Sequence, residues 1–127
     1  EAVIERALKE GLNLIIEGVH LVPGFLKKEI MALPNVVLVV ITSPDESQHR
    51  SRMYSRSESV VTKRPVESYM KEFPKIRAIQ SYLVDRAREE ETMIVENINI
   101  EQTVDEIFEE VMRRAHKIVF GDGKEEP

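Results

Sequence analysis

Apolar positions along the chain follow two periods, and together they predict helices alternating with strands. A short N-terminal helix with one apolar face is expected to end at Gly11, because glycine readily adopts the left-handed conformation of a helix cap. Three short, mostly apolar runs predict strands at Leu12–Ile16, Val36–Ile41 and Thr92–Val95. The middle run contains no polar residue, which is typical of a strand that is buried on both faces of a parallel sheet.

Helices are predicted in the stretches between and after these strands. A helix is expected over residues 44–55, with Ser43 as its cap, Pro44 at its first position and Glu46 completing a capping box. Further helices are expected over residues 25–33 and 65–73. Pro74 then kinks or restarts a helix that continues to about residue 90, and the last helix begins at Thr103.

The order of these elements predicts an α/β fold with a short, mainly parallel sheet of about three strands. Helices on both faces of the sheet would give a three-layer αβα arrangement. Residues 1–120 are expected to form one domain, and the polar residues 121–127 are expected to be a disordered tail. Three strands make a small parallel sheet, which indicates part of a larger architecture.

Composition narrows the classes of function. The chain has 127 residues, 42% of them hydrophobic, with no Cys and a formal net charge of -5. The absence of Cys excludes thiol catalysis, disulfides and Cys-based zinc sites, and it fits a cytoplasmic location. An acidic chain is a poor general ligand for nucleic acid, and no apolar run is long enough to span a membrane. Abundant Glu, Lys and Arg without Cys are typical of heat-adapted proteins.

The first candidate for chemistry is the end of the strand at Leu12–Ile16, where Glu17 and Gly18 follow directly. Ligands of open α/β sheets bind beyond the carboxyl ends of the strands. A carboxylate there can hold Mg²⁺ or orient an attacking hydroxyl group, although a Glu that only faces solvent would look the same. His20 can donate to an anionic substrate or be a loop residue without a task. The three His residues lack the spacing of a zinc site.

A second candidate is the basic segment His49–Arg64, which reverses the sign of an acidic chain. Its cations are Arg50, Arg52, Arg56, Lys63 and Arg64, against a single acid, Glu58. The planar guanidinium suits phosphate, and residues 52 and 56 share one helix face. The alternative is a solvated helix whose arginines pair with neighbouring acids.

Two further sites carry polar residues near the predicted sheet. Arg77 and Gln80 adjoin an apolar helix stripe, where they can reach a ligand or only cover the sheet edge. Asn97 follows the last strand, where it can touch a base or a phosphate, or simply form a turn.

The phosphate-binding loop that many kinases use is missing from the sequence. That loop requires the pattern G-x-x-x-x-G-K-[ST], and the only Gly-Lys pair in the sequence is Gly123-Lys124. The pattern needs Gly six residues before the Lys and Ser or Thr after it, but these positions hold Ile118 and Glu125. No GxSxG, GxGxxG or Ser/His/Asp spacing occurs either.

Taken together, these segments resemble the C-terminal half of P-loop kinases that act on small molecules, and most closely the archaeal 2-phosphoglycerate kinases. The resemblance lies in IIEGVHLVPG at residues 15–24, HRSRMYSRS at 49–57 and FPKIRAIQSYLV at 73–84. It implies a partial P-loop-kinase fold with a lid-like segment at about residues 44–64. It also implies a reaction in which ATP phosphorylates the 3-hydroxyl of 2-phosphoglycerate to give 2,3-bisphosphoglycerate.

The resemblance also implies roles for individual residues. Glu17 would serve Mg²⁺ or position the acceptor hydroxyl. The residues Arg50, Arg52 and Arg56 would be catalytic and close over the phosphates, and His20, Arg64 and Arg77 would bind the substrate. Asn97 would lie near the adenine of ATP. Since the phosphate loop is absent, the chain alone is expected to have negligible kinase activity.

Two hypotheses remain open. The chain is either a piece of such a kinase or a non-catalytic module that binds anions or oligomerises. A sheet that lacks its phosphate-loop strand has an unpaired edge, so a homodimer joined across that edge is one expectation of the second hypothesis.

Overall fold

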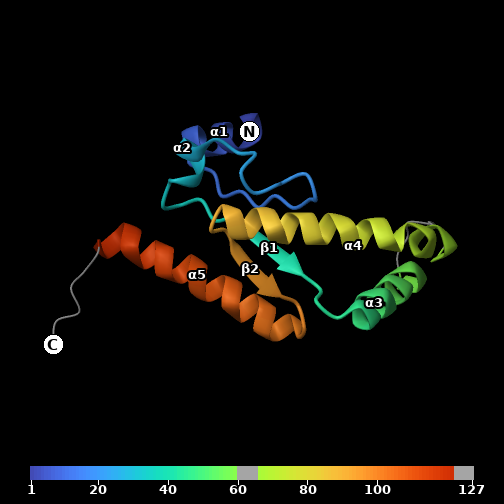
Figure 1. Ribbon diagram of the computed structural model, residues 1–127. Helices are drawn as coiled ribbons and strands as arrows, with labels where there is room; N and C mark the ends of the chain where they lie inside the picture. The colour runs from blue at the N-terminus through green and yellow to red at the C-terminus, as the bar shows by residue number, and fades with distance from the viewer. Residues whose placement is uncertain (60–65, 122–127) are drawn as a thin grey trace.

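The protein is described by a computed structural model over residues 1–59 and 66–121, with side chains described to Ser55 in the first range. It has seven helices and strands in these residues, in the order shown in Figure 1. They are α1 (Ala2–Glu10), α2 (Lys28–Met31), β1 (Val39–Thr42), α3 (Glu46–Ser59), α4 (Val66–Glu89), β2 (Met93–Glu96) and α5 (Ile100–Phe120). The predicted α/β class with a short parallel sheet is confirmed.

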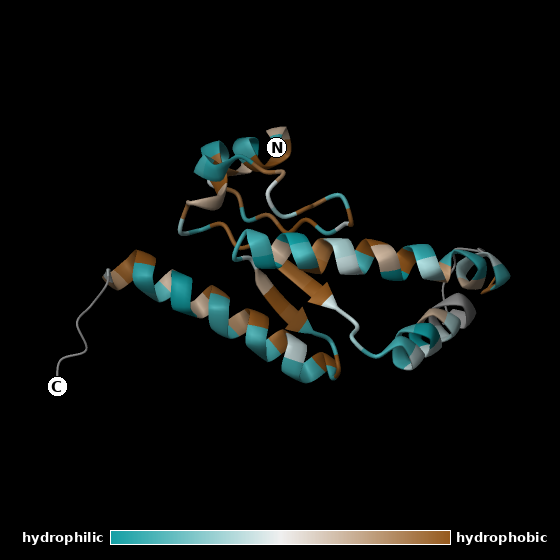
Figure 2. Cartoon of the chain, viewed as in Figure 1, coloured by the Kyte–Doolittle hydropathy of each residue, from teal (hydrophilic) through white to brown (hydrophobic). Residues whose placement is uncertain are grey.

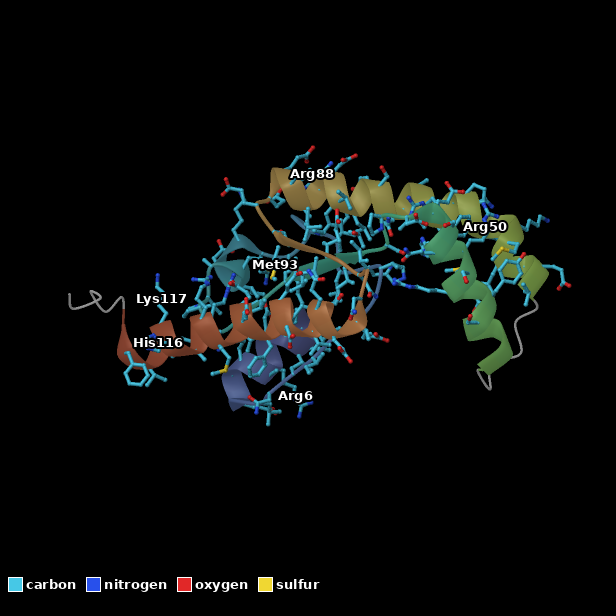
Figure 3. All side chains as sticks on the ribbon, turned by 90° about the horizontal axis from the view of Figure 1, so that it is seen from below. Arg6, Arg50, Arg88, Met93, His116 and Lys117 are labelled. Atoms are coloured by element: carbon cyan, nitrogen blue, oxygen red, sulfur yellow. The ribbon has the colours of Figure 1, made fainter. Side chains whose placement is uncertain are left out.

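The sheet consists of β1 and β2, which pair in parallel from Val39 opposite Met93 to Thr42 opposite Glu96. Helices α3 and α4 connect the two strands, as a parallel pair requires. The strands lie between α4 and α5 in both ribbon views (Figures 1 and 3). Val40 and Val95 of the strands and Ala87 of α4 are buried, and the buried Phe73 of α4 packs against His49 and Arg50 of α3. The apolar strands between two mostly polar helix surfaces are visible in Figure 2.

The predicted strand at Leu12–Ile16 is not formed in the structure, so the described residues contain two strands rather than about three. Residues 12–17 have no assigned strand or helix, and Ile15 is 98% exposed. β-Branched residues favour an extended backbone, but a strand exists only when a neighbouring strand completes its hydrogen-bond ladder. The described part of the chain offers no such neighbour to this segment.

One predicted helix end is confirmed, and two other predicted features of the helices differ in the structure. Gly11 caps α1 in the left-handed conformation as predicted, with φ 65° and ψ 31°. Helix α3 is capped by Asp45, whose Oδ1 accepts from the backbone N of Gln48 at 2.7 Å, and not by Ser43. The prediction of Ser43 as the cap was wrong because its backbone is held by α4. Helix α4 continues through Pro74, where a kink or restart was expected.

The N-terminal part is attached to the rest of the molecule through Pro23 and Gly24. Pro23 is fully buried, and its carbonyl accepts from Nε of Arg86 on α4 at 3.3 Å. Gly24 has φ 83°, and a Cβ atom there would overlap the side chains of Arg86 and Glu90. Glycine therefore allows the loop to approach α4 closely.

The candidate tail falls almost wholly outside the described residues, since only Gly121 of residues 121–127 is described. Gly121 follows the end of α5, as predicted.

Candidate functional site

The carboxyl ends of β1 and β2 bring polar residues from four elements into one cluster. We call it the strand-end cluster, and it consists of Ser43, His49, Arg52, Arg77, Gln80 and Asn97. Its position follows from the parallel pairing, because both strands end at the same edge of the sheet. Helices α3 and α5 begin just beyond this edge, and helix N-termini add positive potential there.

Helix α4 holds the end of β1 with two side chains that lie three residues apart. Gln80 accepts from the backbone N of Ser43 at 2.9 Å through Oε1 and donates to its carbonyl at 3.1 Å through Nε2. Arg77 donates to the carbonyl oxygens of Ser43 at 2.6 Å and Pro44 at 3.2 Å. Together they hold the start of the β1–α3 loop, much as a neighbouring strand would.

Arg52 of α3 holds the end of β2 in a similar way. Its Nη1 donates to the carbonyl of Asn97 at 2.5 Å, and its Nη2 donates to that of Ile98 at 2.9 Å. The Asn97 backbone N donates to Thr42 O at 2.7 Å, which extends the contact between the two strands by one bond. Two arginines, one for each strand, therefore hold the two loops at the carboxyl edge of the sheet.

His49 is half-buried on α3 and contacts Arg77 through one ring nitrogen. Its Nδ1 is 3.3 Å from Nη1 of Arg77. Since a guanidinium only donates, Nδ1 accepts in this contact and the neutral ring carries its proton on Nε2. Burial, with the nearby charges of Arg77 and Arg52, lowers the pKa of His49 below its usual value. The imidazole therefore stays neutral at neutral pH.

Arg50 lies next to the cluster, on the side of α3 that faces Phe73 of α4. Its guanidinium lies 4.4 Å from the ring centroid of Phe73, and its Nη2 pairs with Glu46 at 3.0 Å. The His49 ring meets the same Phe73 edge-on at 5.3 Å. Figure 3 shows Arg50 at the α3–α4 end of the molecule, far from His116 and Lys117 at the other end of α5. A shallow groove along α3 runs past Arg50, Ser47, Ser51 and Ser55.

The structure thus brings together some of the residues singled out from the sequence. Arg52, Arg77 and Asn97 meet in the strand-end cluster, with Arg50 beside it. Glu17 and His20 are exposed on the segment before Pro23, and neither forms a hydrogen bond or ion pair with another described residue. Arg64 and the side chain of Arg56 lie outside the described residues.

Some of the positioning residues were missed in the sequence. Asn99 caps α5, accepting from the backbone N of Glu101 at 2.8 Å, and the helix therefore begins before the predicted Thr103. Asn99, five residues before Val104 of the apolar stripe, was an available signal. His49 carried no sequence signal of its contact, because this depends on how α3 and α4 cross, whereas Gln80 had been named as a residue that could reach a ligand or cover the sheet edge.

The possible metal-binding side chains of the described residues are dispersed. Among the described residues, no three His, Cys, Asp or Glu side chains gather to hold a metal ion. Glu17 provides a single exposed carboxylate, which does not make a Mg²⁺ site by itself. None of the described helices combines the length and apolar character of a membrane span.

Comparison with known proteins identifies a group of relatives. The chain is 40% identical over 117 residues to a 2-phosphoglycerate kinase of Methanothermobacter thermautotrophicus, covering 92% of this chain and 38% of that protein. It is 42% identical over 107 residues to the protein of the same name from Methanopyrus kandleri, covering 84% and 33%. With the Methanocaldococcus jannaschii protein the identity is 39% over 126 residues, covering 99% and 40%.

No family model matches the chain, and no solved structure matches it. The chain spans about two-fifths or less of the length of the relatives described above. The resemblance seen in the sequence is confirmed by these matches. This chain is therefore homologous to the C-terminal portion of the archaeal 2-phosphoglycerate kinases.

Proposed function

We propose that the chain forms the C-terminal part of a 2-phosphoglycerate kinase. Such an enzyme would transfer the γ-phosphoryl group of ATP to the 3-hydroxyl of 2-phosphoglycerate and produce 2,3-bisphosphoglycerate. The observation that carries this proposal is the identity of 39–42% to proteins of that name over 84–99% of this chain. The geometry supports it, because a cationic cluster at the carboxyl edge of a parallel sheet suits a phosphorylated ligand.

The arrangement divides the arginines into two roles. Arg52 and Arg77 donate hydrogen bonds to backbone carbonyls, so they position the two loops and add positive charge at the carboxyl edge of the sheet. Arg50 lies over Phe73 with 44% of its side chain exposed, where its weak pairing with Glu46 can be exchanged for a phosphate oxygen. Positive charge fixed before the ligand arrives is what phosphoryl transfer requires.

The proposal assigns the remaining chemistry to ATP and Mg²⁺ in a complete enzyme. ATP supplies the phosphoryl group, and Mg²⁺ would bridge its phosphates. We propose that the carboxylate of Glu17 faces the ion and that His20 and Arg64 contact the substrate. We further propose that Arg56 contacts the phosphates and that Asn97 lies near the adenine. None of the 127 residues forms a G-x-x-x-x-G-K-[ST] loop, so the β- and γ-phosphates lack their usual cradle.

Two proteins test the assignment. The 127-residue chain alone is expected to show no 2-phosphoglycerate-dependent consumption of ATP. A chimera in which the chain replaces the matching portion of the Methanocaldococcus jannaschii protein is expected to be active, since the match covers 99% of this chain. A folded but inactive chimera would contradict the kinase assignment. Turnover by the chain alone would contradict the need for a phosphate loop.

Ligand binding by the chain alone is a separate test of the basic edge. Thermal unfolding is measured with and without 2-phosphoglycerate, using inorganic phosphate as a comparison. Arg50→Glu is expected to remove the rise in Tm caused by the ligand. Arg88→Glu is the matched control, because Arg88 is an exposed arginine on α4 that pairs only with Asp85 among the described residues. Equal protection of both variants would show that Arg50 does not contact the ligand.

A second candidate function is a non-catalytic module that associates with another chain. It is favoured by the apolar surface that the described fold leaves uncovered, above all on α5. Association and kinase activity are compatible, and the assays above do not depend on whether the chain associates.

A further inference from the structure

Three side chains of α4 lie on one face of the helix and hold the start of α3. Phe73, Arg77 and Gln80 are separated by four and three residues, so they share one stripe along α4. Gln80 and Arg77 bind the backbone of the β1–α3 loop. Phe73 continues the stripe by one turn and meets side chains of α3. Helix α4 therefore holds both the loop and the helix that follows it.

Phe73 is covered by polar groups of α3, and only 1% of it is exposed. The guanidinium carbon of Arg50 lies over the ring, 4.4 Å from its centroid. The His49 ring meets it at an angle of 67°, with 5.3 Å between the centroids. Consecutive residues of a helix project about 100° apart, so a ring that touches both lies in the angle between them. Phe73 is thus wedged between two neighbouring side chains of α3.

The contact between Phe73 and Arg50 suits a cation. The face of a phenyl ring carries negative potential, which attracts a guanidinium group. An aliphatic side chain at this position would fill space but would offer no such face. A long side chain on an open helix surface keeps its rotamer freedom, and a contact of this kind restricts it. The ring therefore holds the Arg50 guanidinium before a ligand arrives.

Arg50 keeps hydrogen-bond donors for a ligand in this position. Its Nη2 donates to Glu46 at 3.0 Å, and its other N–H groups have no acceptor among the described residues. The side chains of Arg50 and Glu46 are 44% and 60% exposed, so this ion pair contributes little and is readily exchanged. Arg50 also borders the groove along α3, beside Ser47 and Ser51. An anion in that groove can accept from the guanidinium while the ring holds it.

We propose that Phe73 is a positioning residue, which holds the guanidinium of Arg50 where it binds the phosphate group of the ligand. This inference rests on the proposed function, because the ligand in question is 2-phosphoglycerate. A guanidinium that is fixed in advance loses less entropy on binding, so Phe73 strengthens the affinity without touching the ligand.

A double-mutant cycle tests whether Phe73 acts through Arg50. Calorimetry measures the binding of 2-phosphoglycerate, and of inorganic phosphate, to wild type, Phe73→Leu, Arg50→Gln and the double variant of the chain. Phe73→Leu is expected to raise Kd about 3–10-fold, because the cation–π contact is lost and a mobile side chain must be ordered on binding. In the Arg50→Gln background the same change is expected to leave Kd unaltered. An equal rise in both backgrounds would show that Phe73 only supports the fold, and this would overturn the inference.

Mobility of the Arg50 side chain tests the positioning without a ligand. NMR relaxation of its Nε–H group is expected to show an ordered side chain in the wild type and a mobile one in Phe73→Leu. Ile30→Val is the matched control, because Ile30 is buried in α2, which lies away from α3 in Figure 1, and its shortening also lowers stability. The control is expected to keep Arg50 ordered and Kd unchanged. A mobile Arg50 in the wild type would overturn the inference whether or not the variants fold, and so would an equally ordered Arg50 in Phe73→Leu.

The outcomes separate this inference from the proposed function. A folded but inactive chimera with the Methanocaldococcus jannaschii protein contradicts the kinase assignment, whereas the binding cycle and the NMR measurement need no turnover. In an active chimera, Phe73→Leu is expected to raise KM for 2-phosphoglycerate more than it lowers kcat. An active chimera whose KM is unchanged by Phe73→Leu would overturn the inference and leave the kinase assignment intact. A wild-type chain that binds neither 2-phosphoglycerate nor phosphate would also overturn it, because Arg50 would then hold no anion.

Discussion

Replacing Arg52 separates a loop-holding role from a role in ligand contact. The structure ties both Nη atoms of Arg52 to carbonyl oxygens of the β2–α5 loop, at 2.5 Å and 2.9 Å. Arg52→Ala would leave both acceptors without this partner. A hydrogen bond to a charged group contributes about 1.5–3 kcal/mol. Since Arg52 is half-buried and water can replace part of the loss, we expect the free energy of unfolding to fall by about 2 kcal/mol.

Two further variants make this measurement specific. Arg52→Lys keeps the charge but can reach only one carbonyl well, so it should recover less than half of the loss. Arg88→Ala removes an exposed arginine of α4 and should change stability by less than about 0.5 kcal/mol. Urea unfolding followed by circular dichroism gives the free energy and its denaturant slope for each protein. An unchanged slope would confirm that only stability differs.

The reasoning would be refuted by a specific pattern of results. If the main role of Arg52 were to bind phosphate, its charge would be repelled by the neighbouring arginines when no ligand is bound. Removing Arg52 would then leave the free energy of unfolding unchanged or raise it. A fall of less than about 0.5 kcal/mol for Arg52→Ala, equal to that of Arg88→Ala, would therefore reject the loop-holding role. Loss of protection by 2-phosphoglycerate in the same variant would then assign Arg52 to the ligand.

Three further predictions concern pH and backbone conformation. The pKa of His49 is lowered in the folded chain, so at a pH between the usual and the lowered value the unfolded state binds the proton and the folded state does not. The free energy of unfolding should therefore fall as the pH drops below about 6.5. His49→Gln should reduce this pH dependence, measured by urea unfolding at pH 7.0 and 5.5. Hydrogen bonds from Arg113 and Arg114 lower the pKa of Glu110 to about 2, so its stabilisation should be present above pH 4.5 and lost as pH falls toward 2. Glu110→Gln should therefore be less stable than wild type at neutral pH by about 1 kcal/mol and equally stable near pH 2, and a constant difference across that range would contradict the assignment. Gly24→Ala should cost about 1–2 kcal/mol in thermal or urea unfolding, since Ala is strained at φ 83° while the overlapping side-chain ends of Arg86 and Glu90 can move; a loss below about 0.5 kcal/mol would show that the loop relieves the strain freely.

Features with a local cause were predictable from the sequence. Gly11 ends α1 because an apolar helix face stops at a residue that tolerates positive φ. The cores of β1 and β2 were predicted within one to three residues because short β-branched apolar runs flanked by polar residues have few alternatives. The family resemblance also followed from the sequence, since three motifs of nine to twelve residues retain their side chains whatever surrounds them.

The strand at Leu12–Ile16 and the roles of the arginines were decided by tertiary structure. Strand propensity resides in a residue, but a strand needs a second backbone at hydrogen-bond distance, and the described fold provides none for this segment. A guanidinium has the same donors for a phosphate as for a carbonyl, so the sequence of the basic segment does not distinguish the two partners. Only the packing of α3 and α4 against the strand ends gives the backbone carbonyls to Arg52 and Arg77 and places Arg50 over Phe73, with 44% of its side chain exposed.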